Sequence, residues 1–360
     1  MKFLILAPYE SDSRFGQNEA LYGELSMYSV QYSWKLIFET LGHVALTAPS
    51  NVIDSLLYKK LDRFKEYLFK INQKKDFLFK KINQYNDNIL YLMKDCDALI
   101  VTGGFSLIKA ETLIKIKKSN KILIYINGMP PFLWLTENEK NSLMYYDLVL
   151  INDPTHIKCW EMLNCKNVVA LPMSSYDSRI VNCKNKKIYT YEISFIGSLA
   201  HHTYANRVDI LKYLIKNQIN ISIWSPDSEY IYEHEDLLKH YMGKIGRSDI
   251  AKVYSESKIV LNIHAISMPG GGNMTTFEAL GSGAFMLIDN FMPAWLKEEK
   301  EVVKYNNKED LLFKITYYLD QDKKREEIAE NGYKRVLKDH TIMKRFEQIL
   351  ELMRTLKTES

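Results

Sequence analysis

The sequence predicts an α/β protein with two doubly wound parallel sheets, one after the other. Short apolar runs alternate with longer amphipathic stretches, as expected when parallel strands buried on both faces are joined by helices. At 360 residues, nearly half of them hydrophobic, the chain is too long for one core. The alternation is also interrupted once, by a polar segment from Asn182 to Tyr191, and then restarts. Together these observations predict two domains.

In the first half, six apolar runs are predicted as strands: residues 3–7, 43–47, 98–102, 121–126, 147–151 and 167–171. Residues 54–94, rich in Lys, Tyr, Phe and Leu, are predicted as one or two long amphipathic helices. The acidic pair in Asp95-Cys96-Asp97 could indicate a DxD metal site, but such a pair must follow a strand. Because it precedes the third strand, a helix-to-strand turn is predicted instead.

The second half repeats the pattern, with strands predicted at residues 193–197, 221–224, 258–263, 284–288 and 302–305. Helical spacing dominates from Glu309 onward, and residues 342–356 are predicted as a helix with one apolar face. The predicted domains are residues 1–181 and 182–341, followed by a C-terminal helical segment, 342–360.

Composition excludes several classes of protein. The 48 basic and 44 acidic residues nearly balance, whereas a nucleic-acid surface needs a clear basic excess. Four cysteines without CxxC spacing favour reduced thiols over disulfides or zinc. The apolar start, MKFLILAPYE, is too short for a signal peptide, and no run approaches the roughly 18 apolar residues of a membrane-spanning helix. We expect a soluble, cytoplasmic protein that binds no nucleic acid.

Ligands of doubly wound sheets bind outside the carboxyl ends of the strands. At one such end, Gly270, Gly271 and Gly272 separate a strand from a helix predicted to begin near Thr275. Glycine lets backbone N–H groups approach a phosphate, and a helix N-terminus adds partial positive charge, so an anion site is predicted. The alternative is a capping box formed by Thr275 and Glu278. Glu278 could otherwise accept hydrogen bonds from a ribose.

A second candidate anion site is GSLAHHTYANR, residues 197–207, which also follows a predicted strand. Arg207 carries most of this hypothesis, because a guanidinium suits phosphate oxygens; the alternative is a solvated helix start. The two histidines in this loop lack further ligands at zinc spacing. Asn262 and His264 lie at the same predicted edge, where each could equally be a satisfied polar group.

Other enzyme classes find little support in the motifs. No GxGxxG follows a predicted strand, GxxxxGK[ST] is missing, and so is GxSxG. The sequence therefore does not favour a nicotinamide enzyme, a P-loop enzyme or a serine hydrolase.

Four segments, taken together, resemble a GT-B glycosyltransferase of the CgeB-like, spore-maturation type: YEISFIGSLAHHTYANRVDIL, GKIGRSDIAKVYSESKIVLNIH, GGNMTTFEALGSGAFMLIDN and NGYKRVLKDHTIMKRFEQIL. The first half resembles the same family more loosely, in DALIVTGG and KILIYINGMPP, and the resemblance covers nearly the whole chain. It implies two Rossmann-like domains facing a central cleft, with the acceptor on the N-terminal side and the donor mostly on the C-terminal side. It also implies that the last helix returns to the first domain.

The resemblance assigns donor-binding roles to particular residues. It implies contacts to the diphosphate by Gly197 and Ser198, to the base by Lys244, Ile245 and Gly246, to the phosphates by Gly271, Gly272, Asn273, Thr275 and Thr276, and to the ribose by Glu278. One feature departs from the family. Many retaining relatives carry a Glu-x7-Glu pair, and the position eight residues before Glu278 is Gly270, so a retaining mechanism is in doubt.

The leading hypothesis is sugar transfer from a UDP or GDP sugar to a hydroxyl of a glycan, protein or small molecule. Neither a metal nor a cofactor is expected, because the resemblance implies that backbone amides, a helix terminus and basic side chains would stabilise the departing diphosphate. Glu10, Asp12 and Glu19 are candidates for a general base, with Arg14 as a possible charge partner. The alternatives are a binding protein without activity, suggested by Gly270, and a nucleotide-sugar epimerase.

Overall fold

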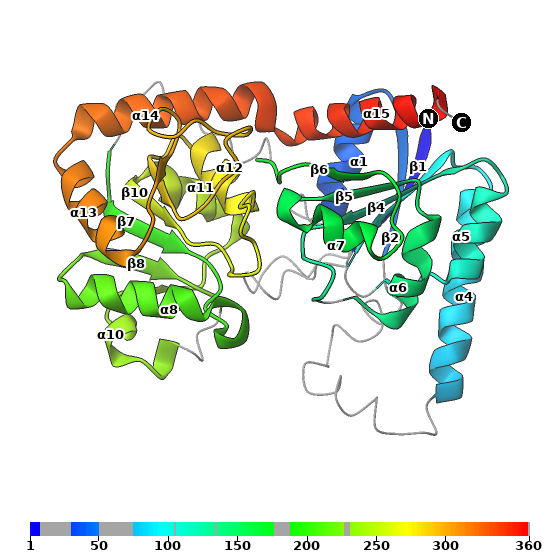
Figure 1. Ribbon diagram of the computed structural model, residues 1–360, viewed down its shortest axis with the longest axis horizontal. Coiled ribbons are helices and arrows are strands. Elements are labelled where there is room, and N and C mark those ends of the chain that lie inside the picture. Colours follow the sequence, from blue (N-terminus) through cyan, green and yellow to red (C-terminus); the bar gives the residue numbers. More distant parts are fainter. Residues whose placement is uncertain are drawn as a thin grey trace. The chain divides into compact units, whose positions relative to one another are not determined.

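The computed structural model describes residues 1–7, 30–49, 75–103, 106–133, 135–175, 188–226 and 231–358. The chain divides into two compact units (Figure 1). Within the described residues, unit 1 comprises those up to Leu171 together with those from Ile349 onward, and unit 2 comprises those from Pro172 to Gln348. The predicted boundary at 181/182 falls in the segment 176–187, outside the described residues, so it stays a prediction.

Unit 1 is built on a six-stranded parallel sheet in the order β2-β1-β3-β4-β5-β6. Its strands are β1 (Lys2–Ala7), β2 (Val44–Pro49), β3 (Ala98–Thr102), β4 (Ile122–Asn127), β5 (Leu148–Ile151) and β6 (Val168–Ala170). Its α-helices are α1 (Val30–Thr40), α4 (Lys75–Met93), α5 (Ala110–Lys117), α6 (Glu137–Ser142) and α7 (Ile157–Glu161), with 3-10 turns η3 (Leu143–Tyr145) and η4 (Pro154–His156).

Unit 2 repeats the architecture with a second six-stranded parallel sheet, in the order β12-β11-β10-β7-β8-β9. Its strands are β7 (Tyr191–Ile196), β8 (Ile221–Trp224), β9 (Tyr241–Gly243), β10 (Ser257–Asn262), β11 (Met286–Ile288) and β12 (Val303–Lys304). Its helices are α8 (His201–Lys216), α10 (Glu235–Leu238), α11 (Arg247–Ser255), α12 (Met274–Gly281), α13 (Lys308–Leu319), α14 (Asp322–Arg335), the π-helical η6 (Val336–His340) and the first part of α15 (Ile342–Thr358).

The central strands are apolar throughout because both faces of each sheet are covered. In unit 2, Leu261 of β10 packs in a core with residues of α8 and α13. Its neighbour Val260 points to the opposite face, into a core that includes Phe277 and Leu280 of α12. In unit 1 the same alternation sends Leu4 toward residues of α4 and α5. Phe3 stacks on Phe38 of α1 at 4.3 Å. The predicted fold class, two doubly wound parallel sheets, is confirmed.

The acidic pair at Asp95 and Asp97 lies in the turn between α4 and β3, as predicted. Asp97 Oδ2 accepts a hydrogen bond from the backbone N–H of Lys2 at 2.7 Å, which fixes the start of β1. This carboxylate is therefore a structural group of the sheet. No helix in the described part of the chain is both long and apolar enough to cross a membrane.

The junction between α14 and α15 is held by a buried histidine, His340. Its Nε2 lies 3.0 Å from the carbonyl oxygen of Trp295, and its Nδ1 lies 3.1 Å from a guanidinium nitrogen of Arg345. Since a guanidinium can only donate, Nδ1 accepts and Nε2 carries the proton. Burial, and next the charge of Arg345, lower the pKa of His340 from 6.5 to about 4. The imidazole of His340 is therefore neutral in the folded protein at neutral pH.

We expect acid to destabilise unit 2 through His340. Between pH 6.5 and 4, His340 is protonated in the unfolded chain but stays neutral in the folded chain. The stability present at neutral pH is therefore lost as the pH falls. From pH 7.5 to 4.5 this one group should cost about 2.5 kcal/mol. Urea unfolding at both pH values measures the loss, which should shrink by that amount in His340→Gln. Equal losses in both proteins would contradict the assignment.

Candidate functional site

The site candidate in unit 2 is the point where the strand order reverses. From β7 the chain proceeds to β8 and β9 on one side, and then crosses to β10, β11 and β12 on the other. The loops that follow β7 and β10 therefore leave the sheet in opposite directions. In doubly wound sheets the crevice between such loops, at the carboxyl ends of the strands, is where ligands bind.

Arg207 of α8 links these two loops. Its Nε donates to the carbonyl oxygen of Ile263 after β10, and its Nη1 to that of Ser198 after β7, both at 2.8 Å. The guanidinium lies 3.8 Å from the ring centroid of Tyr204, and Arg207 is 8% exposed. A Cβ on Gly197 would lie 3.1 Å from Nη1, so the absence of a side chain at Gly197 leaves room for the guanidinium.

The environment of Arg207 indicates a positioning role. Burial lowers the pKa of its guanidinium below its usual value, and the nearby Tyr204 and Asp289 oppose that change. Two of its donors are used on backbone carbonyls. A direct contact between Arg207 and a phosphate stays a prediction. The sequence did not indicate that this side chain joins the loops after β7 and β10.

The start of α12 is fixed by paired amides. Asn262, the last residue of β10, donates from Nδ2 to Oδ1 of Asn273 at 3.1 Å and to the hydroxyl of Thr276 at 2.9 Å. Asn273 returns a hydrogen bond from its Nδ2 to Oδ1 of Asn262 at 3.1 Å. Its Oδ1 also accepts from the backbone N–H of Thr276 at 3.0 Å, which makes Asn273 the N-cap of α12.

This arrangement replaces the capping box that Thr275 and Glu278 were considered to form. The helix begins at Met274, so Thr276, not Glu278, occupies the third helical position. Glu278 lies a further half-turn along α12 and is 4% exposed. Glu278 is therefore not placed to form the capping box with Thr275.

The glycine loop has a structural reason for its composition. Gly271 and Gly272 have φ values of +73° and +83°, which residues with a side chain rarely adopt. A Cβ on Gly271 would lie 2.7 Å from the carbonyl oxygen of Asn290. The loop thus passes directly against the backbone that follows β11, and this contact requires glycine whether or not a phosphate binds.

His264 and Asp289 form a pair at the ends of β10 and β11. Nδ1 of His264 lies 2.6 Å from Oδ1 of Asp289, and the backbone N–H of His264 donates to Oδ2 at 2.9 Å. His264 is 2% exposed, and its Nε2 is a buried atom without a hydrogen-bond partner among the described residues. A carboxylate that holds one ring nitrogen orients the other. The sequence analysis missed Asp289, although its position directly after an apolar strand was a usable signal.

The predicted base-binding residues lie after β9, the edge strand next to β8. Lys244 is exposed, whereas Ile245 packs against the core that contains Phe277. Gly246 is the N-cap residue of α11. These three residues therefore belong to the same carboxyl edge of the sheet as the loops described above, on the β8 side of the switch point.

The comparisons with known proteins agree with this architecture. Residues 207–351 match the sequence profile of the family described as "Glycosyl transferase-like". Comparison with curated protein sequences gave no match. Among solved structures, a glycosyltransferase from Rickettsia africae is similar with a TM-score of 0.64 and 12% identity, over 100% of this chain and 99% of its own. The fold is GT-B.

Two further structures share the GT-B fold with this chain. HepE from Anabaena, solved with UDP and glucose, has a TM-score of 0.61 and 12% identity, over 98% of this chain and 99% of its own. TarM from S. aureus, solved with UDP among other ligands, has a TM-score of 0.57 and 14% identity, over 77% of this chain. The match spans 58% of the TarM chain.

The GT-B chain thus brings together one part of the predicted site. Hydrogen bonds and packing join the two loops flanking the switch point with the start of α12; the members are Ser198, Arg207, Asn262, His264, Gly271, Asn273 and Thr276. The predicted bases Glu10, Asp12 and Glu19 lie outside the described residues. In the described part of the chain, no group of three or more His, Cys, Asp or Glu side chains could hold a metal ion.

Proposed function

We propose that this protein transfers a sugar from a nucleoside-diphosphate sugar to an acceptor hydroxyl, without a metal ion. One observation carries the proposal: at the switch point of unit 2, the N-terminus of α12 is fixed by Asn262, two residues before buried His264, whose Nε2 is oriented by Asp289. A helix N-terminus and an oriented ring nitrogen are suited to the negative charge of a departing diphosphate. The CgeB-like subfamily remains part of the proposal.

Further residues are assigned from the resemblance to GT-B glycosyltransferases. The backbone at Gly197, Ser198, Gly271 and Gly272 and the side chains of Asn273, Thr275 and Thr276 would border the diphosphate, and Glu278 would accept hydrogen bonds from the ribose. Lys244, Ile245 and Gly246 would border the base. HepE was solved with UDP-glucose, which supports a UDP sugar as the first donor to test, ahead of a GDP sugar.

The chemistry requires one bond to form and one to break. The acceptor oxygen attacks the anomeric carbon, the bond from that carbon to the diphosphate oxygen breaks, and the bonding pair leaves with the diphosphate. In an inverting reaction the acceptor proton passes to a base. We assign that base to Glu10, Asp12 or Glu19. WaaB, a similar structure described as a lipopolysaccharide outer core galactosyltransferase, supports a glycan as the acceptor.

A panel of UDP and GDP sugars tests the proposal. We expect one donor to raise the thermal unfolding temperature and to be hydrolysed or transferred, as measured by release of the nucleoside diphosphate. Conversion to another sugar would indicate an epimerase instead, and a thermal shift without turnover would indicate a binding protein. Replacing each of Glu10, Asp12 and Glu19 by Gln should abolish turnover in one case while donor binding persists. Unchanged turnover in all three would remove the base assignment alone.

A further inference from the structure

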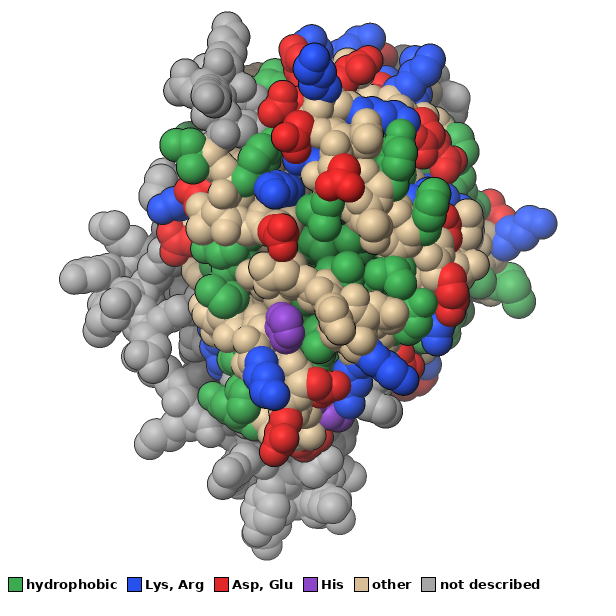
Figure 2. Space-filling model, turned by 90° about the vertical axis from the view of Figure 1, so that its left-hand side faces the viewer, with side chains coloured by type: hydrophobic (Ala, Val, Ile, Leu, Met, Phe, Trp, Pro, Cys, Tyr) green, Lys and Arg blue, Asp and Glu red, His purple; other side chains and the backbone are tan. Residues whose placement is uncertain are grey.

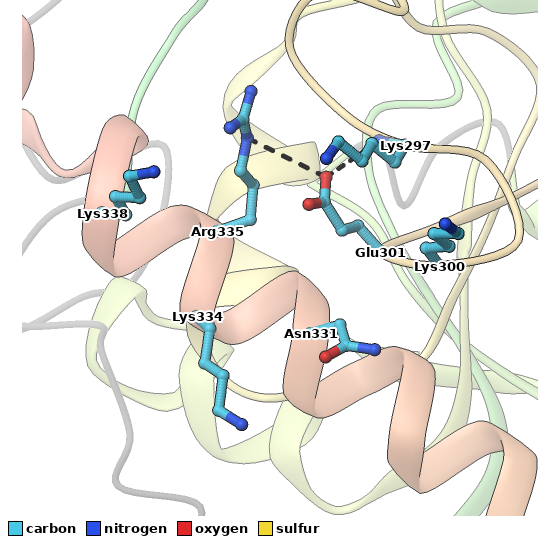
Figure 3. A pocket seen from close by; sticks show the side chains of 7 residues that line it. All are labelled: Lys297, Lys300, Glu301, Asn331, Lys334, Arg335 and Lys338. Carbon is cyan, nitrogen blue, oxygen red and sulfur yellow. Dashed lines mark hydrogen bonds and ion pairs between the residues drawn. The ribbon is translucent and has the colours of Figure 1, made fainter.

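A basic pocket lies elsewhere on unit 2, between α14 and the loop that precedes β12. Its volume is about 360 Å³, and Figure 3 shows its lining: Lys297, Lys300, Glu301, Asn331, Lys334, Arg335 and Lys338. Five of these seven side chains are cations and one is an anion. By contrast, Lys and Arg are interspersed with Asp and Glu on the face drawn in Figure 2. The lining of the pocket is therefore mostly cationic, in a protein of nearly balanced composition.

The cations of the pocket differ in their partners. Lys334 pairs with Glu330 at 2.7 Å, and Arg335 pairs with Asp339 at 2.7 Å and with Glu301 at 3.9 Å. For the exposed side chains of Lys297, Lys300 and Lys338, the described residues provide no ion pair within 4 Å. Three ammonium groups around one pocket are thus available to form ion pairs with a bound anion.

The walls of the pocket are held rigidly. The carbonyl oxygen of Lys297 accepts from the backbone N–H of Glu301 at 2.9 Å, and Glu301 Oε2 accepts from the backbone N–H of Lys297 at 2.8 Å. A Cβ on Gly332 of α14 would lie 2.5 Å from the carbonyl oxygen of Glu301, so helix and loop are in direct backbone contact. Arg335 ties the helix to the same loop through the carbonyl oxygen of Trp295 at 2.9 Å. The backbone that carries these lysines is therefore in place before an anion binds.

A structural explanation accounts for only part of this charge. Lys334 and Lys338 lie near the end of α14, where cations favour the helix macrodipole. Lys297 and Lys300 lie in a loop and gain nothing from that dipole. Like charges around one hollow repel one another, and an anion with several charges would remove that repulsion. Linked phosphate groups are a common biological anion of this kind, because they carry several negative charges on closely spaced oxygens.

We propose that this pocket binds a small anion with two or more phosphate charges, at a site separate from the donor site. The loop from Lys297 to Glu301 leads into the amino end of β12, whereas the donor loops leave the carboxyl ends of β7 and β10. The neighbouring part of α12 is likewise its last turn, since Gly332 packs on Leu280. The proposal is independent of the transferase activity.

Inorganic pyrophosphate is the probe for the test, with calorimetry of the full chain as the measurement. We expect Lys300→Gln combined with Lys338→Gln to weaken pyrophosphate binding at least about tenfold, because two charge-assisted contacts are lost. The matched control is Lys216→Gln combined with Lys239→Gln, two exposed lysines of unit 2 outside the pocket. It removes the same charge and should bind pyrophosphate as the native chain does.

Several outcomes would overturn the site. They are no binding of millimolar pyrophosphate to the native chain, equal binding by the pocket variant, or an equal loss in the control. Donor turnover separates this proposal from the transferase. If the native chain turns over a nucleotide sugar, the pocket variant should do so with unchanged kcat and KM. A parallel loss of turnover would show that the two sites are not separate.

Discussion

Replacing Arg207 by methionine is expected to lower the free energy of unfolding by about 3 kcal/mol, since each buried carbonyl left without a donor costs roughly 1–3 kcal/mol. The buried carbonyl of Ile263 and the partly buried carbonyl of Ser198 would each lose the hydrogen bond from Arg207. Arg207→Lys should fall between the variant and the native protein, because one ammonium is a poor substitute for two donors in a fixed fork. Urea unfolding measures the differences.

The matched control for Arg207 is Lys216→Met in the last turn of the same helix. Lys216 is exposed, so its loss should change stability by less than about 0.5 kcal/mol. The Arg207→Met variant should also bind a donor nucleotide less tightly, because the loops after β7 and β10 lose their common anchor. A variant as stable as the native chain would show that the guanidinium is not needed to hold them.

Replacing Glu278 by glutamine is expected to weaken UDP binding about 30-fold, if the proposed function holds, because a charged acceptor for a ribose diol becomes a neutral amide. Glu278 is almost fully buried. Glutamine has nearly the same shape as glutamate, so the exchange changes the charge without changing the packing. Calorimetry with UDP measures the change. The control, Glu326→Gln on the exposed side of α14, should leave binding unchanged.

A second nucleotide makes the test for Glu278 specific to the ribose. The native chain should bind UDP more tightly than 2′,3′-dideoxy-UDP, and the Glu278→Gln variant should bind the two almost equally. The coupling between side chain and hydroxyls isolates their interaction from any general change in the fold. If the variant weakened both nucleotides by the same factor, Glu278 would act on the structure of the site and not on the ribose.

The strands could be predicted within a few residues because parallel strands covered on both faces appear as continuous apolar runs. The strand that the sequence analysis missed, β9, is the three-residue edge strand Tyr241–Gly243, in which Met242 is exposed. Such a segment lacks an apolar run. The start of α12 was ambiguous for another reason, because Asn and Thr are both good N-cap residues and Asn273 precedes Thr275.

The site was predictable in position but only partly in role. The rule for strand ends located the loops around Gly197 and Gly271, whereas the task of Arg207 depends on carbonyl groups of distant residues. Asp289 likewise becomes informative only when β11 is placed beside β10. Residue type and spacing do not contain such pairings, which arise from packing between segments.

The path of α15 has a consequence for taking this protein apart. Ile349, Leu350 and Met353 are buried and group with unit 1, although more than 170 residues of unit 2 separate them from Leu171. A fragment ending at Leu171 would leave apolar surface bare, and a fragment beginning at Pro172 would carry these side chains without their neighbours. No single scission of the chain can therefore release two self-sufficient halves.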